Sequence, residues 1–165
     1  MMRNLVVCVS VSHGNTKKIA SAMADVLGAP VVEPEEVDVA TLGGYDVVGF
    51  GSGIFAMAFH PRLQTFVASL PTAKRGKAFL FATSGGPELP VWPYTRPMVA
   101  RLETKGFEVV GTFRCRGLDT WLPLRLIGGL NKGHPNDADL AAASSFAAGL
   151  RDDTRTPTTV DASLP

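Results

Sequence analysis

Short apolar runs that alternate with segments of helical spacing constrain the fold of this chain most strongly. The five runs are Leu5–Val9, Ala29–Glu33, Tyr45–Gly51, Ala78–Ala82 and Phe107–Phe113. Such runs are typical of strands buried on both faces of a parallel sheet. Apolar residues three and four positions apart predict helices over Thr16–Leu27, His60–Leu70, Tyr94–Lys105 and Asn136–Leu150. The region up to Gly44 could hold one further helical turn. Alternating strands and helices indicate right-handed βαβ units. We therefore predict an α/β three-layer sandwich, with a five-stranded parallel sheet between two layers of helices.

Composition narrows the class of protein. The chain has 165 residues, of which 45% are hydrophobic and 19% charged, as expected of one globular domain. We assign residues 1–150 to that domain and expect residues 151–165, rich in Asp, Thr and Pro, to form a flexible C-terminal tail. The net charge of +1 gives no reason to expect nucleic acid or a membrane surface as partner.

The expected location is the cytoplasm. No run reaches the roughly 18 apolar residues of a membrane span, and Met1–Asn4 leads into the first strand without the pattern of a secretory signal. Cys8 and Cys115 are far apart in apolar strands, which is typical of buried thiols in a reducing compartment.

The loop after the first strand has the chemistry of a phosphate site. Ser10, Ser12, Asn15 and Thr16 offer hydroxyl and amide donors, and Gly14 allows a close turn before the helix. The free N–H groups at a helix N-terminus favour an anion. The alternative is an ordinary helix cap, because Ser, Asn and Thr also satisfy the first amides of helices that bind nothing.

Two further strands end in glycine and hydroxyl residues. The third predicted strand leads into Gly51–Phe55, and the fourth leads into Thr83–Pro87. Ligands of an open parallel sheet bind outside the carboxyl ends of its strands. Three such loops at one edge therefore predict a binding site there.

On these residues the chain resembles the flavodoxin-like family over about residues 4–150, and the triplet Gly14-Asn15-Thr16 is the most specific match. The resemblance implies strand order 2-1-3-4-5 and FMN as cofactor. It implies that three sets of residues hold FMN: the phosphate would lie on Ser10, Ser12, His13, Gly14, Asn15 and Thr16, one side of the isoalloxazine ring on Ser52, Gly53, Ile54 and Phe55, and the polar edge of the ring on Thr83, Ser84, Gly85 and Gly86.

Aromatic residues near these loops are candidates for stacking on the flavin. They are Phe55, Trp92, Tyr94 and Trp121. One departure from the family is Val11, which stands where a hydroxyl residue is common. His13 is either a phosphate donor or a solvated loop histidine.

The segment Arg114–His134 is too long for a simple connection. It could form a lid over the flavin that carries Trp121, an apolar flap that fills the core, or a partner or homodimer surface rimmed by arginine and lysine. The spacing of His, Cys, Asp and Glu residues suggests no metal site, and no catalytic triad is evident, so we assign no catalytic residue.

These observations favour an FMN-binding redox protein that transfers electrons between redox donor and acceptor proteins, or from a small-molecule reductant. Carrier flavodoxins are strongly acidic, whereas this chain is nearly neutral. A first alternative is therefore an FMN-dependent quinone-type reductase that uses NAD(P)H or a deazaflavin. A second alternative is a cofactor-free binding module on the same fold, and the question of enzyme or carrier stays open.

Overall fold

The structure is a computed structural model, and it describes residues 2–10, 14–85, 93–116, 135–152 and 158–162. The strands are β1 (Asn4–Val9), β2 (Val31–Val32), β3 (Val47–Phe55), β4 (Ala58–Phe59), β5 (Lys77–Ser84), β6 (Glu108–Arg116) and β7 (Thr158–Asp161). The helices are α1 (Asn15–Leu27), α2 (Pro61–Ser69), α3 (Thr95–Thr104) and α5 (Asp137–Asp152), with 3-10 helices η1 (Pro34–Glu36) and η2 (Val39–Gly44) before β3.

The sheet confirms the predicted architecture. Its strands follow the order β2-β1-β3-β5-β6-β7, and every neighbouring pair on this path is parallel. The first five positions are those of the predicted order 2-1-3-4-5. The described residues contain two more strands than the five predicted, because β4 pairs antiparallel with β3 and β7 extends the sheet beyond β6.

Neither of the two additional strands, β4 and β7, has a recognisable signal in the sequence. The β3–β4 hairpin turns through Ala56 and Met57, whose φ angles are 49° and 63°. A two-residue turn with positive φ at both positions usually contains Asn or Gly. Because Ala56 and Met57 stand there instead, the sequence does not indicate the turn. β7 lies in the segment expected to be a flexible tail. Instead, its backbone pairs with β6 while Val160 and Ala162 pack against the core cluster below α1 and α5.

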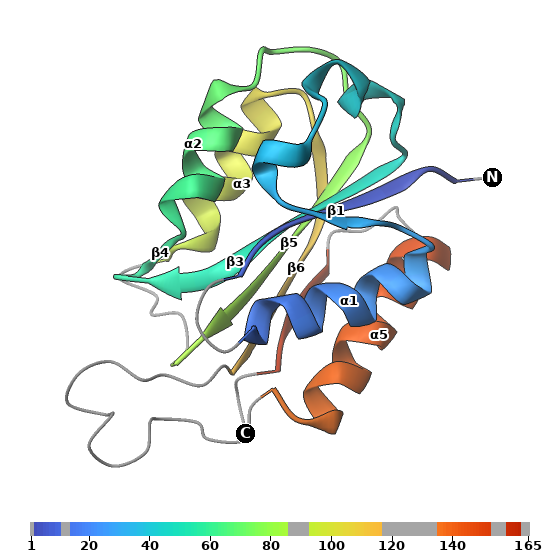
Figure 1. The fold of residues 1–165 in the computed structure, drawn as a ribbon, viewed down its shortest axis with the longest axis vertical. Helices are drawn as coiled ribbons and strands as arrows, with labels where there is room; N and C mark the ends of the chain where they lie inside the picture. The colour runs from blue at the N-terminus through green and yellow to red at the C-terminus, as the bar shows by residue number, and fades with distance from the viewer. Residues whose placement is uncertain (1, 11–13, 86–92, 117–134, 153–157, 163–165) are drawn as a thin grey trace.

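Two helices cover each face of the sheet. α2 and α3 lie on one face, and α1 and α5 lie on the other (Figure 1). Apolar strand residues point alternately into the two layers, as the two-residue period of a strand requires. One core cluster contains Phe50, Leu63, Leu80 and Leu102, and the other contains Ile19, Met23, Phe79, Phe81, Phe113 and Phe146. Among the described residues, no helix is both long and apolar enough to cross a bilayer.

Candidate functional site

The carboxyl ends of the central strands lie at one edge of the sheet. In register, Val9 of β1 pairs with Ser52 of β3, and Gly53 of β3 pairs with Thr83 of β5. The three loops predicted to bind a ligand therefore begin side by side.

Two threonines join the first loop to the third. The hydroxyl oxygens of Thr16 and Thr83 are 2.8 Å apart and share a hydrogen bond. Both residues are buried, with 3% and 6% of their surface exposed. A Cβ atom placed on Gly53 would lie 3.7 Å from each of the two oxygens, so Gly53 completes a neutral, hydroxyl-rich floor between the loops.

The start of α1 suits an anion. Gly14 is the N-cap, in the left-handed conformation with φ 66°, and the first helical turn carries no acidic side chain. Among the described residues, no atom outside its chain neighbours and its own helix lies within 4 Å of a Cβ placed on Gly14. The Lys17 N–H donates to Ser10 Oγ at 3.3 Å, which leaves the hydroxyl hydrogen of Ser10 able to donate to a ligand. The positive end of the helix dipole adds to this preference for negative charge.

The second loop is part of the β3–β4 hairpin. Ser52 is fully buried; its hydroxyl donates to the Gly53 carbonyl oxygen at 2.8 Å and accepts from the His60 N–H at 2.9 Å. The Ser52 side chain thus holds the hairpin in shape. At the tip of β3, Phe55 is 69% exposed, which presents a large aromatic ring beside the site.

Tyr94 supports the third loop. Its ring is 5% exposed and packs edge to face against Phe59, with ring centroids 6.0 Å apart. This packing leaves no open ring face for stacking on a ligand. Its side chain is hydrogen-bonded to that of Ser84, the last residue of β5. Burial raises the pKa of Tyr94 to about 12, and the negative charge of Asp161 adds to this increase.

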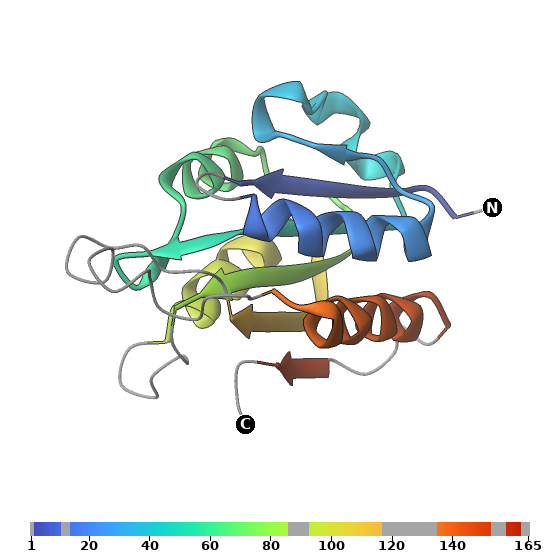
Figure 2. The same ribbon diagram turned by 60° about the horizontal axis from the view of Figure 1, so that its bottom comes forward.

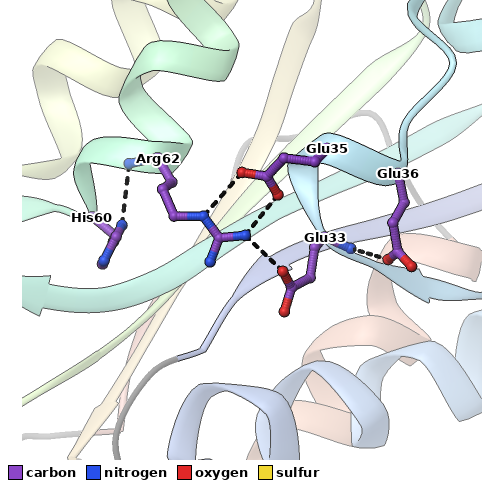
Figure 3. Close-up of polar contacts among 5 residues, drawn as sticks. All are labelled: Glu33, Glu35, Glu36, His60 and Arg62. Carbon is purple, nitrogen blue, oxygen red and sulfur yellow. Dashed lines mark hydrogen bonds and ion pairs between the residues drawn. The ribbon is translucent and has the colours of Figure 1, made fainter.

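His60 joins the hairpin to a surface ion-pair cluster (Figure 3). His60 Nδ1 caps α2 by accepting from the Arg62 N–H at 3.1 Å. The Arg62 guanidinium binds both carboxylate oxygens of Glu35, at 2.9 and 2.6 Å, and one of Glu33 at 2.6 Å. Partial burial lowers the pKa of His60, and the charge of Arg62 lowers it further, so its neutral form is favoured. Hydrogen bonding from Arg62 lowers the pKa of Glu35.

The two cysteines lie in strands next to the site: Cys115 of β6 pairs in register with Thr83 of β5, and Cys8 of β1 pairs with Gly51 of β3. Cys8 and Cys115 are free and buried. Burial is the largest of the effects that raise the pKa of each thiol to about 12, so both stay protonated at neutral pH. Within the described ranges, no group of three or more His, Cys, Asp and Glu residues could hold a metal ion.

Most of the predicted site residues can be placed. Those that lie outside the described residues are Ser12, His13, Gly86, Trp92, Trp121 and the segment 117–134. Of the rest, the structure brings Thr16, Gly53 and Thr83 together and puts Ser10 at the start of α1. Sequence reasoning missed the link between Tyr94 and Ser84, because no spacing rule connects a helix N-cap to the end of a strand.

A sequence profile described as a flavodoxin domain matches residues 6–120 of the chain. The chain belongs to the flavodoxin family. The cofactor of this family is FMN. The residues present fit FMN, because the edge combines a helix N-terminus without acidic side chains, buried hydroxyls and an exposed aromatic ring.

The chain is also similar to individual proteins over most of its length. An uncharacterized protein of Methanocaldococcus jannaschii is 37% identical over 149 residues, which cover 90% of this chain and 98% of that protein. Among solved structures, a flavodoxin from the domain Archaea has a TM-score of 0.65 at 19% identity, covering 90% of this chain and 96% of that one. Oxidised Flavodoxin 2 from Bacillus cereus has a TM-score of 0.68 at 18% identity, covering 91% and 98%. These two likenesses establish the fold.

Proposed function

We propose that this flavodoxin-family protein transfers electrons through one non-covalently bound FMN. When bound, FMN supplies one- and two-electron redox chemistry, and the protein supplies binding, orientation and electrostatics. The observation that carries the proposal is the hydrogen bond between Thr16 and Thr83 beside Gly53, because it joins the loops at the sheet edge where ligands of this fold bind.

Each loop would have one task. The phosphate would bind at the start of α1, on the backbone of Gly14, Asn15 and Thr16 and the hydroxyl of Ser10, together with Ser12 and His13. The ring would lie against Gly53, Ile54 and Phe55, where the exposed ring of Phe55 offers offset stacking. Backbone groups of Thr83, Ser84, Gly85 and Gly86 would bind the polar edge of the ring. The aromatic candidates Trp92 and Trp121 would cover what remains open.

A reductase is the second candidate, and the charge balance favours it. A net charge of +1 provides little of the long-range attraction by which a strongly acidic carrier would steer toward basic redox proteins. An enzyme that acts on a small acceptor such as a quinone, with NAD(P)H or a deazaflavin as donor, has no such need. Both candidates would use the same FMN site, and we expect either to act in the cytoplasm.

The deciding experiment is an absorption spectrum of the purified protein, taken before and after incubation with FMN and removal of the excess by gel filtration. Flavin bands that stay with the protein are the expected result. A protein that retains no flavin would overturn the proposal and favour the cofactor-free binding module. With FMN bound, reduction by NAD(P)H alone would identify a reductase, whereas reduction only through a protein donor would identify a carrier.

A further inference from the structure

A cavity of about 200 Å³ lies between the β3–β4 hairpin and α3, on the face of the sheet that carries α2 and α3. Its walls come from the hairpin, α2 and α3, and include Met57, Phe59, Gln64, Tyr94, Met98 and Arg101. The hairpin projects beyond the N-terminal end of α1 (Figure 2). Among the described residues, those proposed to hold FMN do not line the cavity. It is therefore separate from the proposed phosphate site.

The inner wall of the cavity is apolar and fixed in place. Phe59, Tyr94 and Met98 are 2%, 5% and 4% exposed, and Phe59 packs edge to face against Tyr94. Gln64 Nε2 donates to the Phe59 carbonyl oxygen at 2.7 Å, which holds the Gln64 side chain at this wall. Two prolines, whose rings fix their φ angles, also line the cavity. Walls that are ordered in advance lose little conformational entropy when a ligand enters.

Met57 lines the cavity from the hairpin turn. It is 37% exposed, and its φ of 63° is a left-handed conformation that is unfavourable for a residue with a Cβ. Backbone strain of this kind is concentrated at ligand sites and active sites. Methionine is flexible, and its sulfur makes favourable contacts with aromatic rings. Because Met98 lines the same cavity, two thioethers are available to an aromatic ligand.

Arg101 carries the one charge on the described walls of the cavity. The residue is exposed, and within the described part of the chain its guanidinium makes no ion pair or hydrogen bond. Arg62 differs from it, because its guanidinium already binds the carboxylates of Glu33 and Glu35. A guanidinium can bind a carboxylate through two parallel hydrogen bonds. Arg101 therefore favours a ligand that carries a carboxylate.

We propose that this cavity binds a small aromatic carboxylate, with the ring against Met57 and Met98 and the carboxylate on Arg101. Apolar walls with a few polar groups are typical of small-molecule sites. The cavity is smaller than the roughly 300–1,000 Å³ of sites for drug-sized ligands, so a ligand of one or two rings would fill it. The inference goes beyond the proposed function, because it assigns a second ligand to residues outside the FMN loops.

The first test measures affinity by isothermal titration calorimetry. The probe is 2-naphthoate, and 2-naphthamide is its neutral counterpart. Arg101→Gln should raise the dissociation constant of 2-naphthoate roughly tenfold, the effect of losing a hydrogen bond between charged groups, and should change that of 2-naphthamide less than about twofold. The matched control is Arg96→Gln, which removes the same charge from an exposed position of α3 that does not line the cavity. It should change both constants less than about twofold.

The second test locates the bound probe. In protein labelled with carbon-13 at the methionine methyl groups, 2-naphthoate should shift the signals of Met57 and Met98. The signal of Met23, which is buried in the other core cluster, should stay unchanged. Ala58→Leu enlarges a side chain that lines the cavity and should weaken the binding of both probes more than tenfold.

Three results would overturn the proposal: no saturable binding of 2-naphthoate to the wild type, equal weakening by Arg101→Gln and Arg96→Gln, or shifts at Met23 in place of Met57 and Met98. The Arg101→Gln variant changes only an exposed side chain, so it remains informative if Ala58→Leu does not fold. Repeating the titration with FMN separates the two proposals. Competition between FMN and 2-naphthoate would make the cavity part of the flavin site and overturn the inference. A protein that bound 2-naphthoate but no FMN would overturn the proposed function alone.

Discussion

The two edges of the sheet use their polar groups in different ways. At the edge where the parallel strands begin, polar groups bind one another: the Arg3 N–H donates to Asp46 Oδ2 at 2.7 Å, and Arg75 Nε donates to the Lys105 carbonyl oxygen at 3.1 Å. At the carboxyl ends of β1, β3 and β5, small neutral groups lie together, namely the hydroxyls of Thr16 and Thr83 and the backbone of Gly14 and Gly53. The first edge is built for stability. The second combines buried hydroxyls with a helix N-terminus, a combination that suits an anion.

Of the changes considered, substitution of Gly14 should have the largest effect on FMN binding. Gly14 and Gly28 stand at opposite ends of α1, both left-handed, with φ of 66° and 62°, and glycine positions of this kind strain any larger side chain; within the described part of the chain, a Cβ on either would have no neighbour within 4 Å. Gly14→Leu and Gly28→Leu should therefore each lose about 1–2 kcal/mol of stability through backbone strain. Only Gly14→Leu should weaken FMN binding, by roughly 100-fold or more, because its side chain occupies the proposed phosphate site.

The measurements for this pair are flavin fluorescence titration and urea denaturation. Equal loss of FMN binding in the two variants would mean that the effect comes from damage to the helix. Full retention of FMN by Gly14→Leu would refute the assignment of the phosphate loop.

Gly76→Ala should destabilise the edge of the sheet where the parallel strands begin, without altering the residues of the proposed FMN site. A Cβ on Gly76 would lie 2.6 Å from the Tyr45 carbonyl oxygen and 2.8 Å from that of Asp46, where β3 and β5 begin. Because the neighbours are backbone atoms, relief requires the strands to shift, and we expect a loss of about 2 kcal/mol in the free energy of unfolding. The folded variant should bind FMN as the wild type does. A variant as stable as the wild type but defective in FMN binding would contradict the division of roles between the edges.

The Thr16–Thr83 pair should show how the carboxyl edge is held together. Thr16→Val or Thr83→Val leaves the remaining buried hydroxyl without its partner, at a cost of about 1–2 kcal/mol in the free energy of unfolding. The double variant should lose no more than either single variant, because replacing both partners by groups of similar shape leaves no unpaired hydroxyl. Thermal denaturation of the wild type, the two single variants and the double variant provides the data for this double-mutant cycle. Additive losses would show that the two hydroxyls act independently.

Much of this arrangement could be predicted from the sequence, because strong local patterns produce it. Continuous apolar runs identified the central strands, and the start of α1 followed from Gly14-Asn15-Thr16. β7 was missed because its interactions lie in tertiary pairing with β6, and Thr-Thr-Val-Asp carries no periodicity of its own. Tyr94 was a candidate for stacking, but its burial against Phe59 and its bond to Ser84 depend on how α3 packs, which no spacing along the chain reveals.

The smallest expected effect is the pH dependence that His60 gives to the carboxyl edge. The pKa of His60 is lowered in the folded protein, by burial first and by Arg62 second, while Glu35 opposes the shift. Above pH ~6.5, the value of an unperturbed histidine, His60 is neutral in both states and adds no pH dependence. As the pH falls below this value, the unfolded chain takes up the proton first, so stability decreases until the pH is below the folded pKa.

Protonation at Nδ1 would also remove the acceptor that caps α2, and a cap of this kind contributes about 1 kcal/mol. His60→Asn keeps a capping acceptor and does not titrate in this range, so it serves as the control. Urea denaturation of both proteins from pH 7.5 to pH 5 should show a steeper loss of stability for the wild type, by less than about 1 kcal/mol over the range. The remaining acidic and histidine groups titrate in both proteins, so the difference between the curves isolates His60. If the stability of the two proteins fell in parallel with pH, the helix cap and the hairpin would tolerate a protonated His60. The hydrogen bond from the His60 backbone N–H to Ser52 would then not depend on a neutral imidazole ring.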